Sequence, residues 1–116
     1  MKGFLKYAAF LFVIYHLTAN VNIFNIEGES MQPTLFNGDK VLVQTNCDVE
    51  VGDIVIIEFQ EEYLIKRITS IKDDSIYIEG DNQDNSFDSN DFGWINISQV
   101  YGKVIIPLTW YFKLMI

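Results

Sequence analysis

Short runs of β-branched residues, bounded by Gly, Asp and Asn, are the feature that most constrains the fold of this chain. Such runs occupy residues 40–43, 54–59, 63–71, 76–79 and 100–106. Turn signals separate them, including N-G-D at residues 37–39, G-D at 52–53 and K-D-D-S at 72–75. This pattern is typical of strands joined by tight turns. The sequence therefore predicts a mainly β fold with one domain over residues 21–107.

A polar stretch at residues 80–93 interrupts the strand pattern. It reads G-D-N-Q-D-N-S-F-D-S-N-D-F-G, and from this composition we expect neither a regular strand nor a helix. We call it the polar loop. Long loops inside compact domains are usually functional, so we expect the polar loop to contribute to a site.

An apolar run follows Lys2 at the N-terminus. Counted from Gly3, it extends for about 17 residues, the lower limit for a helix that spans a bilayer. The lysines at this end and the acidic residues beyond the run favour a cytoplasmic N-terminus. We therefore expect residues 1–20 to be a single-pass anchor in the cell membrane, with the domain at residues 21–107 extracytoplasmic. A signal peptide cleaved after Ala19 is the alternative.

The C-terminal segment, residues 108–116, is apolar and aromatic but too short to span a membrane. Two interpretations stay open for this tail. It lies in the membrane interface, with Trp110 and Tyr111 at the level of the headgroups, or it packs on the β domain.

Charge and cysteine content exclude several classes of protein. The net charge is −8 at pH 7, and a protein that binds nucleic acid needs clustered Lys and Arg instead. The single cysteine, Cys47, has no partner for an internal disulfide and no companion for a metal site. We therefore expect no nucleic acid, no metal and no cofactor.

A serine shortly after the apolar run, Ser30, is the candidate nucleophile. Its hydroxyl needs a base to remove the proton. The one histidine, His16, lies within the apolar run, so a Ser-His-Asp triad is excluded for the domain. A lysine can be the base where burial in apolar surroundings disfavours its charged form.

Lys66 is the lysine with such a setting. Alternation along the predicted strand places Lys66 on one face with Leu64 and Ile68, and Ile65 and Arg67 on the other face. Lys66 is therefore the candidate base. An ordinary lysine on an edge strand is the alternative reading of the same spacing.

Four segments resemble, in their order, the sequence boxes of type I signal peptidases, the membrane-bound Ser-Lys proteases that cut signal peptides from exported proteins. They are GESMQPTL at residues 28–35, GDKVLV at 38–43, YLIKRI at 63–68 and GDNQDNSFDS at 80–89. The serine box is also similar to that of the self-cleaving repressors of the SOS response. The last box, together with an apolar N-terminus, is much more specific to the signal peptidases.

The resemblance implies a signal-peptidase-like β fold, here as a minimal member, and a role for each matching residue. Ser30 would be the nucleophile, with its backbone N–H in the oxyanion hole, Lys66 the general base, and Ser86 the group that orients the lysine amine. The remaining roles are structural support by Arg67, Asp81 and Asp88, with Arg67 and Asp81 paired, and apolar substrate-binding pockets lined by Met31, Leu35, Leu64 and Ile65.

The sequence departs from the family pattern at three places. Asn90, two residues after Asp88, stands where the family often has an arginine, so Asp88 lacks its expected arginine partner. Gly28 stands where some members have a hydroxyl residue that completes the oxyanion hole. The interval between Lys66 and Gly80 is short, whereas many bacterial members carry a long insertion there.

The sequence thus predicts a membrane-bound serine endopeptidase that cleaves signal peptides from exported preproteins by a Ser-Lys dyad. Its expected partners are signal peptides, the lipid membrane and, further, the secretion machinery. A soluble self-cleaving repressor is disfavoured by the apolar N-terminus. A catalytically silent factor that assists the assembly of exported or surface proteins is the main alternative, although both Ser30 and Lys66 are present.

Overall fold

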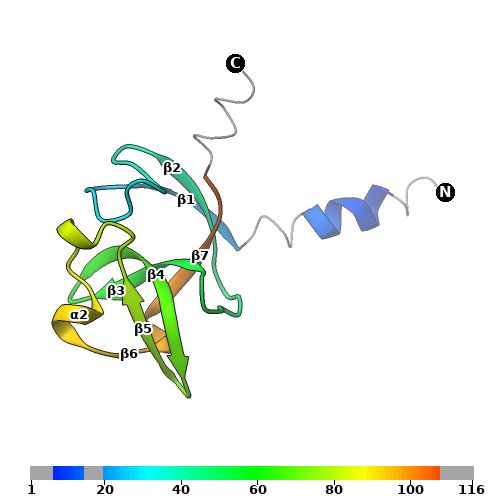
Figure 1. Ribbon diagram of the computed structural model, residues 1–116. Helices are drawn as coiled ribbons and strands as arrows, with labels where there is room; N and C mark the ends of the chain where they lie inside the picture. Colours follow the sequence, from blue (N-terminus) through cyan, green and yellow to red (C-terminus); the bar gives the residue numbers. More distant parts are fainter. Residues whose placement is uncertain (1–6, 15–19, 108–116) are drawn as a thin grey trace.

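The strands form one antiparallel sheet, whose neighbours run in the order β1-β2-β7-β3-β4-β5-β6 (Figure 1). The computed structural model describes residues 7–14 and 20–107. The strands are β1 (Val21–Asn25), β2 (Lys40–Gln44), β3 (Ile54–Phe59), β4 (Glu62–Lys72), β5 (Ser75–Glu79), β6 (Ile95–Asn96) and β7 (Val100–Pro107). The short helical segments are η1 (Gln83–Asn85), α2 (Ser89–Phe92) and η2 (Ile97–Gln99).

The mainly β prediction is confirmed. β2, β3, β4, β5 and β7 each begin and end within one residue of a predicted strand. β1 and β6 were not predicted. β1 has the sequence VNIFN, in which asparagines break the apolar run, and β6 is only two residues long.

The sheet curls, so that β1 at one edge faces β4. The ring of Phe24 in β1 meets the ring of Tyr63 in β4 edge-to-face, with centroids 5.7 Å apart. Tyr101 of β7 completes the group, at 5.4 Å from Phe24 and 5.5 Å from Tyr63. This curl creates a space between β1 and the first half of β4.

Two hydrophobic clusters fill the domain, one on each side of β3 and β4. The first contains Ile56 and Ile65, and the second contains Val55 and Ile57, with Leu64 packed against it. Successive side chains of both strands therefore enter different clusters, as strand alternation predicts. The buried members of the two clusters are Ile26, Met31, Leu35, Val41, Val43, Ile56 and Ile65 in the first, and Val55, Ile57, Ile68, Ile76, Ile78 and Ile95 in the second.

The expectation that the polar loop contains no regular helix was wrong. η1 and α2 both lie within it. Asp88 caps α2, because its side chain accepts from the backbone N–H of Asn90 while the side chain of Asp91 accepts from the backbone N–H of Asp88. Asp and Asn are poor inside helices but favourable at helix starts, so a polar composition does not exclude a short capped turn.

Residues 7–14 are helical, and their apolar side chains are exposed. Within the described parts of the chain, no helix has the length and apolar character needed to cross a bilayer. Most of the predicted anchor, residues 1–6 and 15–19, lies outside the described residues, as does the predicted tail at 108–116.

Candidate active site

Ser30 and Lys66 line the same cleft. The cleft has a volume of about 500 Å³ and lies between the end of β1, the segment that carries Ser30 and the first half of β4. We call residues 26–39 the serine loop. The residues that line the cleft are Phe24, Asn25, Ile26, Glu27, Ser30, Ile56, Glu62, Tyr63, Leu64, Ile65 and Lys66.

The serine loop is tied to the polar loop, which lies beside it in Figure 1 (cyan and yellow). The backbone N–H of Asn82 donates to the carbonyl oxygen of Ser30 at 2.8 Å, and the Asn82 side chain donates to the carbonyl oxygen of Glu29 at 3.0 Å. The hydroxyl of Thr34 donates to Asp81 at 2.6 Å. Two segments about 50 residues apart in sequence are thereby fixed to each other at Ser30.

Gly80 lies at the point where the two loops touch. A Cβ atom at this position would come within 2.3 Å of Ser86 Oγ and 2.6 Å of the carbonyl oxygen of Ser30. Both distances are far below ordinary contact, so only glycine fits here. Because the same added atom would meet both groups, the side chain of Ser86 and the backbone of Ser30 converge on Gly80.

Lys66 is buried, with 4% of its surface exposed, and its amine donates to Ser86 Oγ at 3.1 Å. Burial lowers the pKa of Lys66 below its usual value of 10.5, against the opposing attraction of Asp88 and Asp91. Among the described residues no hydrogen bond joins the side chains of Lys66 and Ser30. Catalytic hydrogen bonds are often long without substrate, so the shared cleft is the relevant observation.

The hydroxyl of Ser86 donates to Asp88 Oδ2 at 2.7 Å. A hydroxyl has one hydrogen, so Ser86 offers Lys66 only a lone pair. Asp88 is 1% exposed and also accepts from the backbone N–H groups of Gly80, at 2.9 Å, and Asn90, at 3.0 Å. Burial raises the pKa of Asp88, but its hydrogen bonds outweigh this effect and the net pKa is lowered. Asp88 is therefore an ionised carboxylate behind Ser86.

The ion pair that the resemblance implies between Arg67 and Asp81 is present. Arg67 Nε and Nη2 donate to the two carboxylate oxygens of Asp81, each at 2.8 Å. Arg67 Nη1 also donates to the carbonyl oxygen of Gly52 at 2.7 Å. The hydrogen bond from Arg67 lowers the pKa of Asp81. This pair links β4, next to Lys66, with the polar loop and, through Thr34, with the serine loop.

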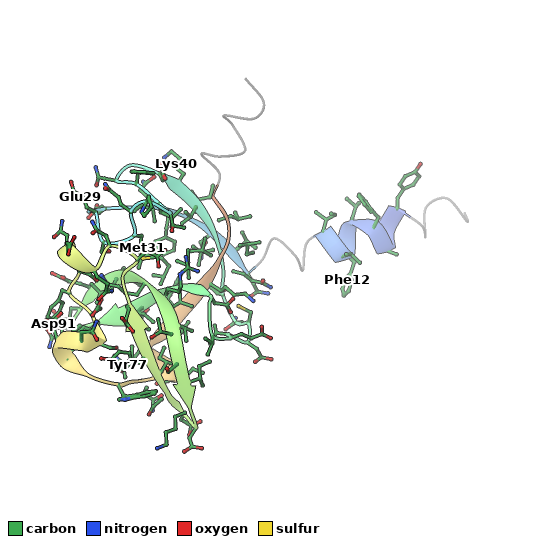
Figure 2. The ribbon with its side chains drawn as sticks, in the orientation of Figure 1. Phe12, Glu29, Met31, Lys40, Tyr77 and Asp91 are labelled. Carbon is green, nitrogen blue, oxygen red and sulfur yellow. The ribbon has the colours of Figure 1, made fainter. Side chains whose placement is uncertain are left out.

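Of the four apolar residues expected to bind substrate, Leu64 and Ile65 line the cleft. Met31 and Leu35 do not line it: each is 1% exposed and packs in the first cluster, which also contains the lining residues Ile56 and Ile65. Figure 2 shows Met31 within the β domain. Four apolar residues of the lining were not predicted from the sequence: Phe24, Ile26, Ile56 and Tyr63. The signal for Ile26 was its position as the apolar first residue of the serine loop.

Among the described residues, no group of His, Cys, Asp and Glu is arranged to hold a metal ion. The arrangement of Ser30, Lys66, Ser86 and Asp88 is suited to a nucleophile with an oriented amine base.

Comparison with known proteins identifies relatives that are peptidases. Residues 4–105 match the family model described as Peptidase S24-like. The mitochondrial inner membrane protease subunit 2 of Schizosaccharomyces pombe is 32% identical, over 84% of this chain and 68% of that protein. The same subunit of Danio rerio is 33% identical, over 67% of this chain and 58% of its own length. Signal peptidase I P of Bacillus subtilis subsp. natto is 28% identical, over 75% of this chain and 57% of its own.

These matches make the chain a peptidase of the S24-like class. Within that class it belongs to the type I signal peptidase family, which confirms the resemblance of its sequence boxes. The chain spans between just over half and two thirds of the length of these relatives.

Proposed function

We propose that this chain is a membrane-bound endopeptidase that cleaves N-terminal signal peptides from exported preproteins, with Ser30 as nucleophile and Lys66 as general base. One observation carries the proposal: Lys66 is 4% exposed, its amine donates to Ser86, and it shares a cleft with Ser30. A buried amine loses its proton more readily than an exposed one, which a base needs near neutral pH.

In this mechanism, neutral Lys66 takes the proton from Ser30 Oγ as that oxygen attacks the scissile carbonyl carbon. The carbonyl electrons move onto oxygen, and the backbone N–H of Ser30 donates to the resulting oxyanion. Lys66 then gives its proton to the leaving amine, and an ester on Ser30 remains. Water attacks the carbonyl carbon of this ester while Lys66 takes a proton from the water. Lys66 then gives that proton to Ser30 Oγ as the C–O bond breaks, which releases the carboxylic acid product and restores the serine hydroxyl and the neutral lysine. Ser86 orients the lysine throughout by accepting one N–H.

An extended peptide is the form of substrate that the cleft favours. β4 pairs with β3 from Glu62 onward, but it pairs with β5 only from Arg67 onward. Among the described residues, the other edge of β4 therefore has no strand partner at residues 62–66, and these residues line the cleft. A peptide strand can add to such an edge through main-chain hydrogen bonds, with side chains in apolar pockets.

The membrane part of the proposal is an anchor at residues 1–20, with the N-terminus cytoplasmic and the domain extracytoplasmic. The exposed apolar helix at residues 7–14 and the names of relatives as inner membrane proteases support it. Enzyme and precursor would then share one membrane, which raises their effective concentration. The tail at 108–116 is a further candidate for contact with the lipid. The secretion machinery is a further candidate partner of the enzyme.

Cleavage of a defined precursor tests the proposal. The full chain is reconstituted in lipid with precursors that carry a small-x-small site, beside Ser30→Ala and Lys66→Ala. We expect cleavage at that site by the wild type and a loss of at least about 10³-fold in either variant. If no folded form cleaves any of several precursors, the silent assembly factor becomes the better reading. Cleavage by Lys66→Ala at the wild-type rate would exclude the lysine base.

A further inference from the structure

Two amide side chains of the polar loop, those of Gln83 and Asn90, hydrogen-bond to each other and to groups around Ser86, the residue that accepts from the Lys66 amine. Gln83 Nε2 donates to the carbonyl oxygen of Gly80 and, at 3.4 Å, to Asp88 Oδ2. Gln83 Oε1 accepts from Asn90 Nδ2 at 3.0 Å. Both donor hydrogens and the acceptor oxygen of the Gln83 amide are therefore engaged, and this amide has one orientation.

Asn90 is itself fixed to β5. Its side-chain oxygen accepts from the hydroxyl of Tyr77 at 2.7 Å, and its amide nitrogen also donates to Glu79 at 3.3 Å. Its backbone N–H donates to Asp88 Oδ1. Since β5 pairs with the part of β4 that follows Lys66, Asn90 joins the polar loop to the frame that carries the lysine.

The path continues from Asp88 to the lysine. Asp88 Oδ2 accepts from Ser86 Oγ at 2.7 Å, and Ser86 Oγ accepts from Lys66 Nζ at 3.1 Å. We propose that Gln83 and Asn90 are positioning residues for Lys66, which form an amide latch that holds Asp88 and, through it, Ser86 against the lysine amine. The inference rests on the proposed function, because it takes Lys66 as the base.

The amide latch is important because the groups that donate hydrogen bonds to the Asp88 carboxylate are neutral. They are the backbone N–H groups of Gly80 and Asn90 and the side chains of Gln83 and Ser86. The ion pairs found among the described residues are Arg67–Asp81 and Lys103–Asp53, and neither includes Asp88. A buried carboxylate that loses one donor has to move or to gain water. Either change would release the hydroxyl of Ser86 and open a path for water to Lys66, which is now 4% exposed.

Kinetics on the full chain in detergent test the latch through Gln83→Ala, Asn90→Ala and the double variant. We expect kcat to fall by about 10- to 100-fold with KM little changed, because the reacting groups are displaced while the substrate edge is intact. The double variant should fall no further than the worse single variant, since both act through one path. Asp84→Asn, on η1 beside Gln83 but outside the path, is the matched control and should behave as wild type.

Titration of Lys66 by NMR, with carbon-13 in the lysine side chains, gives a readout independent of cleavage. The Lys66 signal is assigned by its loss in Lys66→Ala. Water that reaches the amine relieves the burial that lowers its pKa, so the pKa of Lys66 should rise in both latch variants while Asp88 and Asp91 still face it. The acid limb of the pH–rate profile should then move to higher pH. Gln83→Glu, which keeps size and removes both donors, should act likewise if Gln83→Ala fails to fold.

The outcomes separate the two proposals. If wild type cleaves precursors and neither latch variant changes kcat or the pKa of Lys66, the latch is overturned and the proposed function stands. If wild type cleaves no precursor, the proposed function fails, and the NMR titration alone then decides whether the latch holds the lysine. An equal change in Asp84→Asn would also overturn the latch, because the effect would belong to the loop in general.

Discussion

Phe24 of β1 and Tyr63 of β4 are in edge-to-face contact, although β2, β7 and β3 lie between their strands in the order of the sheet. The contact depends on the curl of the sheet. It also places both rings in the lining of the cleft that holds Ser30 and Lys66. The shape of the cleft is therefore coupled to the curl of the sheet.

Replacement of Phe24 by Ala tests this coupling. The variant loses ring contacts with Tyr63 and Tyr101, and we expect the free energy of unfolding to fall by about 1–3 kcal/mol. KM should rise with kcat nearly unchanged, because the ring lies at the wall of the cleft and not at the reacting atoms. Denaturant unfolding and steady-state kinetics measure the two effects. Phe36→Ala is the control, since Phe36 is 46% exposed and does not line the cleft, and it should leave KM unchanged.

Gly80→Ala should damage the site more than it damages the fold. Its Cβ would collide with Ser86 Oγ and with the carbonyl oxygen of Ser30, which is backbone and cannot easily move away. We expect about 1–3 kcal/mol of destabilisation and a loss of kcat of at least about 10-fold. Gly93→Ala is the matched control, because its φ of +84° strains any side chain while nothing lies within 4 Å of the added atom. Equal loss of kcat in the two variants would contradict a specific role for Gly80.

The pH dependence of cleavage should report Lys66. Burial lowers the pKa of Lys66, and the negative charge of Asp88 partly restores it. Activity should therefore rise with pH, and the apparent pKa of this rising limb of the pH–rate profile should be below the usual lysine value of 10.5. Asp88→Asn removes the attraction, so the limb should move to lower pH even as kcat falls. A pH–rate profile for each enzyme measures this shift. A limb that stays in place, or one that moves to higher pH, would contradict the proposed electrostatic contact.

The ion pair of Arg67 and Asp81 should contribute to stability only above acidic pH. The folded pKa of Asp81 is below its ordinary 3.8, so its contribution is present above that value and is lost as pH falls through the lowered pKa. Both side chains are partly exposed, and we expect Asp81→Asn to lower the free energy of unfolding by about 1 kcal/mol at pH 7. Urea unfolding at pH 7 and at about pH 2.5 measures the difference. If Asp81→Asn lowers the free energy of unfolding by as much at the acidic pH as at pH 7, the charge of Asp81 is not the cause of its contribution.

Much of the fold could be predicted because local pattern determined it. The runs that became β3 and β4 are rich in β-branched residues and alternate between two clusters, so their type and length follow from sequence. β1 could not be predicted in this way, since its value as a wall of the cleft depends on the curl of the whole sheet. The same holds for Met31 and Ile26. Both are apolar residues of the serine loop, and only tertiary packing decides which of them lines the cleft.

The polar loop shows the limit most clearly. Ser86, Asp81 and Asp88 were assigned roles through the family resemblance, whereas Gln83 and Asn90 had none. Their hydrogen bonds join residues that are brought together by the capped turn of α2, and no spacing in the sequence specifies such a path. The hydrogen bonds of Asn90, a departure from the family pattern, therefore become apparent only in the folded chain.

The most direct test of the account is to detect the ester on Ser30. A rapidly quenched reaction with a precursor peptide, followed by intact-mass measurement and peptide mapping, locates the acyl group. We expect an added mass equal to that of the signal-peptide fragment less one water, carried by the peptide that contains Ser30. It should be absent in Ser30→Ala and form at least about 10³-fold more slowly in Lys66→Ala. An acyl group on another residue, or its formation at the wild-type rate in Lys66→Ala, would contradict it.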